Sequence, residues 1–502
     1  MSGSAETAGQ VVPDDGTTCP ELARTRAGDD PARVAIRVDG TRELSAGQWL
    51  EQADALARGL VARGAGPGVR VAVRCDDWLD YAVSALAVYL SGATLVGLGP
   101  GLSPQETSRR LTHCGVSGIV HAGGVEAPGF EGWTTTPARD ARAGPARFTD
   151  PGPDDLAEII HTSGTTGRAK PVAVPQANLT FGQSGGGRLP GAAISVFAPV
   201  RPGTNAGHSA VLYALTSGAT VHLLSDPRPQ TIAAAMADIR VGMVILPAPL
   251  ATRLVVTGLL EDRDLSSVPA VMLGSAPAPT ATVHHLRRLL PGATLSIGYG
   301  STEAAPASTW LSGVDGTEPA GTLGGSRPGV DVEIRDDGGT PLGPGEVGHI
   351  WLRSPAPPRR YYRLDDGTFR DGWTRMGDLG TLDGDGAMCF FDRTADAVVL
   401  DGRRMSTFQV EDALHWHPAV ADASVVHLPD ADGGRLVAAV ELREPVDASA
   451  LTAHLHEQVT APELRSRDRL EVLPVTSLPR GGLDKVLKRR LRESLSPASA
   501  DR

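Results

Sequence analysis

Cysteine is scarce in this sequence, and its placement excludes two kinds of small stabilised protein. The 502 residues contain four cysteines, far apart and without a CxxC pair: Cys19, Cys75, Cys114 and Cys389. A disulfide framework or a structural zinc site needs cysteines at short, repeated spacings. We therefore expect neither, and a reducing compartment.

The sequence also lacks the features that direct a protein to nucleic acid, a membrane or export. Its formal net charge of −11 is spread without long single-sign runs, which argues against nucleic acid or an anionic membrane as the main partner. Residues 1–15 have no basic start and no apolar segment, so we expect a disordered tail and no signal peptide. Small-molecule chemistry in the cytoplasm fits these absences.

One uncharged stretch, Tyr81 to Pro104, is long enough to cross a bilayer. Four residues that disfavour a continuous helix interrupt it: Gly92, Gly97, Gly99 and Pro100. No basic flank orients the stretch in a membrane. We predict a buried helix that ends near Gly92 and is followed by a buried strand.

Short β-branched runs recur along the first half of the chain, with amphipathic stretches between several of them. The runs cover residues 69–73, 93–98, 194–198, 219–224, 242–247 and 270–274. Apolar residues from Leu50 to Val61 recur at helical spacing, with Glu51 and Arg58 on the opposite side. Strands that alternate with such helices predict an α/β fold, with parallel-rich sheets covered by helices.

The character of the sequence changes twice toward the C-terminus. From about residue 325, alternating runs separated by Asp-Gly and Gly-Pro turns predict a small β-rich subdomain. Beyond Arg393, residues 423–442 are expected to form two strands, and a basic helix is expected over 484–495. We therefore predict a large domain over residues 1–393 and a small, mobile α+β domain over 394–502.

A loop rich in glycine and hydroxyl groups follows a short apolar run. It consists of Thr162, Ser163, Gly164, Thr165, Thr166 and Gly167, with Lys170 three residues on. Glycine lets backbone N–H groups approach phosphate oxygens, hydroxyl groups add hydrogen bonds, and lysine supplies a mobile charge. The loop is not a Walker motif, because no glycine directly precedes Lys170 and no Ser or Thr follows it. Taken alone, it fits either polyphosphate binding or a surface turn.

The segment GYGSTE follows a strand-like run and contains Gly298, Tyr299, Gly300, Thr302 and Glu303. Its glycines permit a tight exit from the strand, and Tyr299 offers a flat face for a purine. Glu303 is a hard oxygen ligand suited to magnesium. An ordinary strand-to-loop turn is the alternative.

Three more side chains further along suit a nucleotide. Asp378 could accept hydrogen bonds from a ribose diol, and Arg393 lies where the two predicted domains meet. Lys485 follows a glycine-containing loop and is expected to open the basic helix. Taken singly, these residues also fit a hairpin, a structural salt bridge and a solvated surface charge.

Together, in this order and spacing, the five segments resemble the acyl-adenylate-forming superfamily of acyl- and aryl-CoA synthetases, stand-alone adenylation domains and luciferase-like enzymes. The resemblance covers most of the chain, from about residue 43 to Lys485. It implies an enzyme that uses ATP and Mg2+ to activate a carboxylic acid as acyl-AMP, with release of pyrophosphate. The acyl group would then pass to a thiol of CoA or of a carrier protein's phosphopantetheine supplied in trans. The implied partners are thus a small acid and, where used, a carrier protein, with no nucleic acid or membrane.

The resemblance also implies a role for each segment. Residues 162–167 would bind the ATP phosphates, Tyr299 with its flanking glycines would bind adenine, and Asp378 and Arg393 would contact the ribose. Glu303 would hold magnesium. The implied catalytic residues are Lys485, Thr302 and Lys170. The implied acid pocket includes Thr204, Gly207, Gly274, Ser275 and Ala276.

Some positions depart from the family pattern. Pro171 follows Lys170 where glycine is usual, Ala395 occupies the hinge position, and Asp484 replaces the glycine before the catalytic lysine. Gly203 and Thr204 replace a frequent aromatic-His pair, which favours a roomier or more polar pocket for an aryl, short acyl or β-amino acid. Two alternatives stay open. The chain could pass an activated carboxylic or small inorganic oxyacid to an amine, or it could bind nucleotide without turnover.

Overall fold

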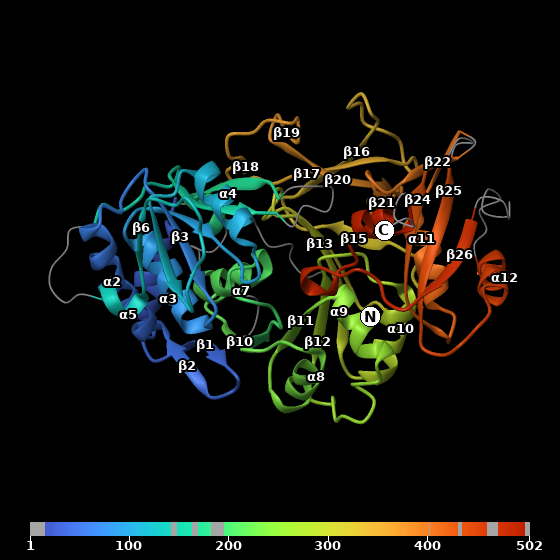
Figure 1. Ribbon diagram of the computed structural model, residues 1–502, viewed down its shortest axis with the longest axis horizontal. Helices are drawn as coiled ribbons and strands as arrows, with labels where there is room; N and C mark the ends of the chain where they lie inside the picture. Colours follow the sequence, from blue (N-terminus) through green and yellow to red (C-terminus); the bar gives the residue numbers. More distant parts are fainter. Residues whose placement is uncertain are drawn as a thin grey trace, which may run out of the picture.

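Two sheets, each with a parallel core, organise the first four-fifths of the molecule (Figure 1). The structure is a computed structural model that describes residues 16–141, 148–162, 169–181, 195–400, 402–429, 434–458 and 470–496. We refer to residues 16–393 as the large lobe and to residues 394–496 as the C-terminal segment.

The first sheet has the strand order β18-β8-β7-β4-β3-β5-β6. Its strands are β3 (Arg70–Cys75), β4 (Thr94–Gly97), β5 (Gly118–Ala122), β6 (Trp133–Thr135), β7 (Leu156–His161), β8 (Pro171–Pro175) and β18 (Arg360–Tyr361). Strands β3 to β7 pair in parallel, whereas β8 and β18 are antiparallel to their neighbours. Strand β18 therefore brings residues near 360 beside the segment that carries Lys170.

The second sheet has fourteen strands in the order β16-β17-β20-β21-β15-β14-β13-β12-β11-β9-β10-β1-β2, with β19 paired to β20. The parallel part contains β1 (Val34–Val38), β9 (Ser195–Phe197), β10 (Thr220–Leu223), β11 (Met243–Pro247), β12 (Ala270–Gly274) and β13 (Thr294–Gly300), and β2 (Arg42–Ser45) closes its edge. The antiparallel part contains β14 (Ser308–Ser312), β15 (Thr322–Ser326), β16 (Asp331–Arg335), β17 (Gly348–Arg353), β19 (Phe369–Arg370), β20 (Trp373–Leu382) and β21 (Met388–Arg393). The β-rich region expected from about residue 325 is this antiparallel part, so it continues the parallel sheet.

Helices cover these sheets. They are α1 (Cys19–Asp29), α2 (Ala46–Ala62), α3 (Trp78–Leu90), α4 (Pro104–Cys114), α5 (Pro137–Asp140), α6 (Gln176–Thr180), α7 (Asn205–Thr216), α8 (Pro229–Asp238), α9 (Ala248–Val256) and α10 (Thr280–Leu289). The Asp77 carboxylate caps α3 by accepting from the backbone N–H groups of Leu79 and Asp80. The predicted buried helix and strand over residues 81–104 are thus confirmed as α3 and β4. No described helix is both long enough and apolar enough to span a bilayer.

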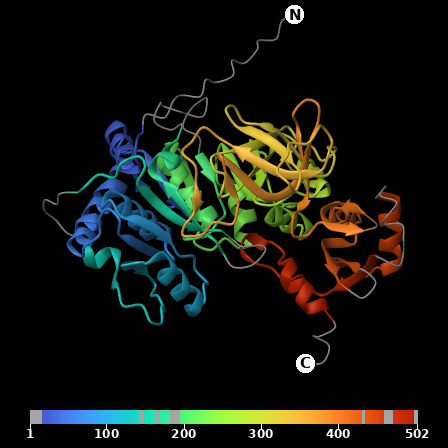
Figure 2. The ribbon, with the colours of Figure 1, turned by 90° about the horizontal axis from the view of Figure 1, so that it is seen from above.

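The C-terminal segment has apolar clusters of its own, drawn from residues 398–495. Its elements are β22 (Val398–Leu400), β23 (Arg403–Met405), α11 (Thr407–His415), β24 (Val420–Leu428), β25 (Arg435–Leu442), α12 (Ala448–Gln458), β26 (Leu470–Val475), the 3-10 turn η2 (Gly482–Asp484) and α13 (Lys488–Leu495). Figure 2 shows this segment, in orange and red, beside the large lobe, with the red end of the chain reaching back toward it.

One boundary in this segment corrects the sequence prediction. Helix α13 begins at Lys488, so Lys485 does not open it. Val486 instead forms an antiparallel bridge with Arg480, and the Leu487 N–H donates to the carbonyl of Pro479 at 2.8 Å. Because these backbone groups are held in a tight hairpin-like loop, the helical hydrogen bonds start only beyond it.

Candidate adenylation site

Tyr299, Asp378 and Arg393 meet at the junction of the parallel and antiparallel parts of the second sheet. Tyr299 lies at the end of β13, and its hydroxyl donates to Asp378 Oδ2 at 2.7 Å. Strands β20 and β21 place Asp378 directly opposite Arg393, and Arg393 Nη1 lies 3.0 Å from Asp378 Oδ1. Strand register thus brings these three side chains together, although Tyr299 and Arg393 are 94 residues apart in the sequence. We call Tyr299, Asp378 and Arg393 the strand trio.

The carboxylate of Asp378 is 3% exposed, and one of its oxygens retains hydrogen-bonding capacity. Burial raises the pKa of Asp378, while the charge of Arg393 and the hydroxyl of Tyr299 act in the opposite direction. Oδ1 accepts no hydrogen bond from a described residue, because the nearby Arg393 nitrogen is not aligned for one. A buried acceptor in this condition is suited to a hydroxyl donor from a ligand.

Lys485 of the C-terminal segment lies close enough to the strand trio for its charge to interact with those of Arg393 and Asp378. Burial, together with repulsion from Arg393, lowers the pKa of Lys485 to about 8, while Asp378 and Asp396 favour its charged form. The same attraction acts on the Asp378 carboxylate in return. A lysine from the C-terminal segment therefore shares one electrostatic environment with a carboxylate and an arginine of the large lobe.

Thr302 and Glu303 follow β13 and are held by side chains that the sequence analysis did not single out. Arg359 donates to the Thr302 carbonyl at 2.7 Å, and Asn205 donates to the Thr302 hydroxyl at 2.5 Å. The Tyr361 hydroxyl donates to Glu303 Oε1 at 3.1 Å. Arg359 and Tyr361 flank or belong to β18, a two-residue strand too short to stand out as a sequence pattern.

Glu303 was the predicted magnesium ligand. The described residues contain no cluster of three or more His, Cys, Asp or Glu side chains that could hold a metal ion. Magnesium bound with a nucleotide typically takes one or two carboxylates and completes its shell with phosphate oxygens and water. A single half-buried carboxylate at Glu303 fits that mode of binding.

The predicted phosphate loop lies mostly outside the described residues. Ser163, Gly164, Thr165, Thr166 and Gly167 belong to that part. At the base of the loop, the Thr162 N–H donates to the Lys170 carbonyl at 3.0 Å. Lys170 Nζ lies 2.6 Å from Asp366 Oδ2 and 5.0 Å from the centre of the Tyr361 ring. The base of the loop, at Thr162 and Lys170, thus lies beside the segment that contains Tyr361 and Asp366. Tyr361 is the residue that donates to Glu303.

The five predicted pocket residues fall into two groups. Thr204 caps α7, accepting from the Gly207 N–H at 3.0 Å, and a Cβ on Gly207 would lie 1.9 Å from the Arg201 carbonyl oxygen. These two residues shape the start of α7. At the end of β12, a Cβ on Gly274 would lie 3.3 Å from the Gly298 carbonyl oxygen, so Gly274 lies against the predicted adenine segment. Ser275 follows with a left-handed backbone at φ 69°, and Ala276 comes next in the chain.

The sequence did not reveal a buried polar network that joins His208 of α7 to Glu158, Tyr89 and Tyr81. Glu158 of β7 is fully buried, pairs with His208, and accepts from the Tyr89 hydroxyl at 2.6 Å. Tyr81 lies 2.9 Å from His208 Nδ1. Burial alone would raise the pKa of Glu158, but His208 and Tyr89 outweigh it, so this pKa lies below its ordinary value. A single glutamate within the apolar run of β7 was the available signal.

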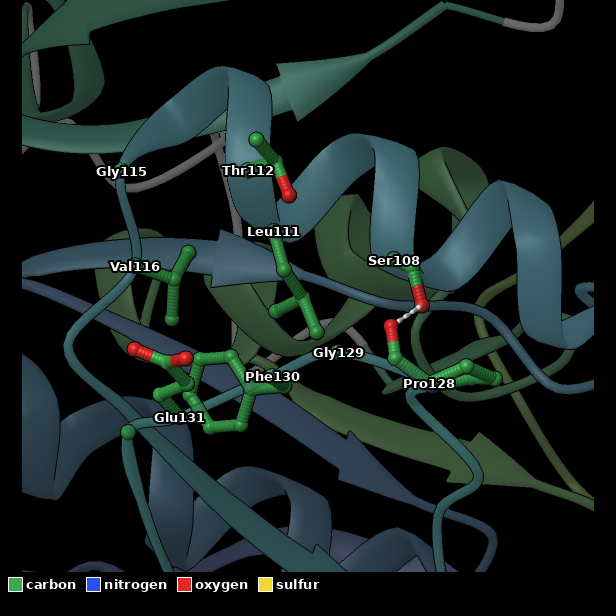
Figure 3. Close-up of a pocket in the computed structure, with 10 residues that line it drawn as sticks. Ser108, Leu111, Thr112, Gly115, Val116, Pro128, Gly129, Phe130 and Glu131 are labelled. Carbon is green, nitrogen blue, oxygen red and sulfur yellow. Dashed lines mark hydrogen bonds between the residues drawn. The ribbon is translucent and has the colours of Figure 1, made fainter.

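A pocket of about 240 Å³ lies elsewhere on the large lobe, between α4 and residues 128–132 (Figure 3). Ser108 donates to the Pro128 carbonyl at 2.8 Å across its rim, and Leu111 and Phe130 line it. None of its lining residues belongs to the predicted site. The pocket is therefore separate from the predicted site.

The α/β lobe and the smaller C-terminal segment are the two parts that the resemblance to adenylate-forming enzymes led us to expect. Residues 23–362 match the family model described as AMP-binding enzyme, and the chain belongs to this family.

Comparisons with individual proteins agree with this placement. The chain is 29% identical over 490 residues to a feruloyl-CoA synthase from Amycolatopsis sp, covering 93% of this chain and 97% of the relative. It is 27% identical over 495 residues to an indoleacetate–CoA ligase from Aromatoleum aromaticum, covering 93% and 96%. Among solved structures, the amide bond synthetase McbA from Marinactinospora thermotolerans matches with a TM-score of 0.81 and 26% identity, over 95% of this chain and 100% of that one. The predicted superfamily, fold class and enzyme type, an AMP-forming acid–thiol ligase, are confirmed.

Proposed function

We propose that this protein uses ATP to convert an aromatic carboxylic acid to its acyl-adenylate and transfers the acyl group to the thiol of CoA. The observation that carries this proposal is the strand trio, in which the buried Asp378 carboxylate accepts from Tyr299, lies 3.0 Å from Arg393 and keeps one oxygen without a hydrogen bond among the described residues. A ribose hydroxyl can donate to that oxygen. The names of the two relatives reported above support the choice of acid, since feruloyl and indoleacetate groups are both aromatic.

The proposed nucleotide position follows from the contacts of the strand trio. The Tyr299 ring stacks on adenine beside Gly298 and Gly300, while Asp378 Oδ1, which lacks a hydrogen bond, accepts from the ribose hydroxyls. Arg393 contacts the ribose and keeps Asp378 charged. Residues 162–167 and Lys170 bind the β- and γ-phosphates.

The chemistry of the first step explains why positively charged groups are needed near the phosphates of ATP. A carboxylate oxygen of the acid attacks the α-phosphorus of ATP, the bond to the bridging oxygen breaks, and pyrophosphate leaves with that electron pair. Lys485 and the Thr302 hydroxyl contact the α-phosphate oxygens, on which negative charge accumulates. Glu303 would hold magnesium, which would neutralise negative charge on the phosphates when bound.

In the second step, a thiolate attacks the acyl carbon of the adenylate and AMP leaves. The acyl-adenylate is a mixed anhydride, and it is reactive because AMP leaves as a stable phosphate monoester anion. CoA is the proposed acceptor because the named relatives are CoA ligases, and a carrier protein's phosphopantetheine presents the same thiol chemistry. We also propose the division into domains at residues 393 and 394, which the separate apolar clusters of residues 398–495 support.

ATP–pyrophosphate exchange against a panel of aryl, short acyl and β-amino acids tests the proposal. Exchange that depends on an aromatic acid, followed by formation of its CoA thioester detected by mass, is the expected result. No exchange with any acid of the panel, in a protein that still binds ATP, would instead favour nucleotide binding without turnover. Exchange that responds only to short acyl or β-amino acids would overturn the aromatic assignment.

An amine acceptor is the second candidate, and one comparison favours it. The amide bond synthetase named above is similar over nearly the whole chain, and Ala395 occupies the position where the superfamily usually has a polar hinge residue. Adding CoA, a phosphopantetheinylated carrier protein or an amine separately to the enzyme, ATP and the active acid distinguishes the acceptors. An amide as the only product would replace CoA in the proposal.

A further inference from the structure

The segment that carries Lys485 is a loop of residues 479–487, here called the lysine loop. Its ends are joined by two hydrogen bonds of 2.8 Å, from the Gly481 N–H to the Lys485 carbonyl and from the Leu487 N–H to the Pro479 carbonyl. Between them, Leu483 packs against the apolar cluster that underlies α2, α3 and α7 of the large lobe. The lysine loop is therefore internally ordered and also touches the large lobe.

Ion pairs attach the lysine loop to its own segment. Arg480 lies 2.8 Å from Asp422 of β24 and 2.9 Å from Glu441 of β25. His415 also pairs with Asp422, at 3.0 Å. These contacts fix the start of the loop to the sheet of the C-terminal segment.

A single arginine of the large lobe joins this charged group from the other side. Arg253 of α9 lies 3.2 Å from Glu441 and 3.4 Å from Asp484 Oδ2. Together with Arg480, Asp422 and Asp484, it lines a narrow crevice between α9 and the C-terminal segment. Arg253 is thus shared between Asp484 of the lysine loop and Glu441 of β25, which also pairs with Arg480 of the loop.

Asp484 has a backbone conformation that glycine would adopt more readily. Its φ is 62°, and that of Leu483 is 58°, both in the left-handed region. The Asp484 carboxylate also lies 3.6 Å from Arg480, and its buried Oδ2 accepts no hydrogen bond among the described residues. A carboxylate at this position therefore interacts by charge with two arginines, one from each part of the molecule.

We propose that Arg253 is a positioning residue that holds the lysine loop against the large lobe through Asp484 and Glu441, and so keeps Lys485 at the strand trio. This inference rests on the proposed function of Lys485 in adenylate formation. It also gives the replacement of glycine by Asp484 a purpose, because glycine has no charge to attract Arg253.

The proposal separates the two half-reactions. Attack on the α-phosphorus needs the Lys485 ammonium beside the phosphate, whereas attack of a thiolate on an adenylate already formed takes place at the acyl carbon. Loosening the lysine loop should therefore slow the first half-reaction and leave the second nearly unchanged. A general loss of structure would slow both.

Arg253→Gln, Asp484→Asn and the double variant test this separation, with Arg228→Gln as the matched control. Arg228 belongs to the same lobe and pairs with Asp226, but both side chains are at least half exposed. We expect each single variant to slow ATP–pyrophosphate exchange about fivefold, the double variant to be little slower than either, and the control to match the wild type. Thioester formation from supplied acyl-adenylate and CoA should stay within about twofold. Equal losses in both half-reactions, or no loss in either, would overturn the proposal.

Asp484→Gly adds a sharper test, because it relieves the left-handed backbone while it removes the charge. We expect it to lose exchange as Asp484→Asn does. A glycine variant as fast as the wild type would overturn the charge-based argument.

Hydrogen–deuterium exchange of the full chain gives a readout that does not depend on activity. The amides of Gly481 and Leu487 should exchange faster in Arg253→Gln than in the wild type or in Arg228→Gln. Unchanged protection there would refute the positioning role even if pyrophosphate exchange were slower. Faster amide exchange in an enzyme that activates no acid would support the role of Arg253 while contradicting the proposed function.

Discussion

Tyr299, Asp378 and Arg393 lie on three strands of one sheet, whereas Lys485, whose charge interacts with those of Asp378 and Arg393, belongs to a loop of the C-terminal segment. The strand trio is located by hydrogen-bonded register, and β20 and β21 put Asp378 opposite Arg393 whatever the side chains do. The lysine loop depends on ion pairs made by Arg480 and Arg253. The comparison teaches that binding and catalysis can be perturbed separately, because substitutions in one half need not move the other.

The largest expected effect on the rate comes from a substitution in the lysine loop. Lys485→Ala should lower the rate of ATP–pyrophosphate exchange roughly a hundredfold, because it removes a charge contact of about 3 kcal/mol to the transition state. Arg489→Ala is the control, since Arg489 is exposed and pairs with Glu493 on α13. A wild-type rate of ATP–pyrophosphate exchange in Lys485→Ala would show that Lys485 does not act with the strand trio in adenylate formation.

The next effect is on the stability of the large lobe. Glu158→Gln should lower the free energy of unfolding of the large lobe by about 3 kcal/mol at neutral pH, because His208 loses its buried partner. Urea unfolding followed by tryptophan fluorescence measures this, since Trp49 and Trp78 lie in the adjoining apolar cluster. The exposed Glu126→Gln is the control.

The sign of the pH dependence gives a second check on Glu158. Because the pKa of Glu158 is lowered in the folded protein, its stabilisation is present above the unfolded value and is lost as pH falls through the folded value. The difference between wild type and Glu158→Gln should therefore shrink below about pH 4.5. A difference that stays constant with pH would contradict the charged pair.

The pH dependence of kcat/KM for ATP distinguishes the contribution of Lys485 from that of the strand trio. With the pKa of Lys485 lowered to about 8, the ammonium is lost as pH rises through that value, so kcat/KM for ATP should fall about tenfold per pH unit above it. Lys485→Arg keeps its charge, so the descending limb should disappear in that variant even if its rate is lower. The folded state also carries a cost for the Lys485 charge below pH 8, which is relieved between about pH 8 and 10.5.

The smallest expected effect comes from a substitution in the strand trio and concerns the KM for ATP. Tyr299→Phe keeps the ring that is proposed to stack on adenine but removes the hydroxyl that donates to Asp378. We expect KM for ATP to rise about fivefold, from a loss of about 1 kcal/mol, with kcat nearly unchanged. Tyr362→Phe is the control, because the Tyr362 ring contacts His113 and Arg363. A fall in kcat comparable to that of Lys485→Ala would break the division between binding and catalysis.

Most strands and helices could be predicted because their patterns are local. The runs at residues 242–247 and 270–274 became β11 and β12 with nearly the expected bounds, and the amphipathic stretch after Ser45 became α2. The start of α13 was predicted too early, since the bridge between Arg480 and Val486 is invisible to helical periodicity. Local pattern therefore predicted elements well and their junctions less well.

The side chains that support the site were harder to predict. Arg359 and Asn205 contact Thr302 from positions 57 residues after it and 97 before it, and neither lies in a recognisable motif. Arg253 is the single charged residue of helix α9, with no sequence signal to link it to Asp484. Their partners depend on how whole elements pack, which periodicity does not report.

The sequence by itself determined the α/β class and the superfamily, and it marked the five segments that are proposed to carry the chemistry, because hydrophobic period, turn residues and motif spacing are local properties of the chain. Only the tertiary structure decided that Asp378 faces both Tyr299 and Arg393, that Glu158 is buried against His208, and that Arg253 reaches Asp484. The physical reason is that burial and charge pairing arise between elements far apart in sequence, and their energies depend on distances of a few ångströms that folding alone sets.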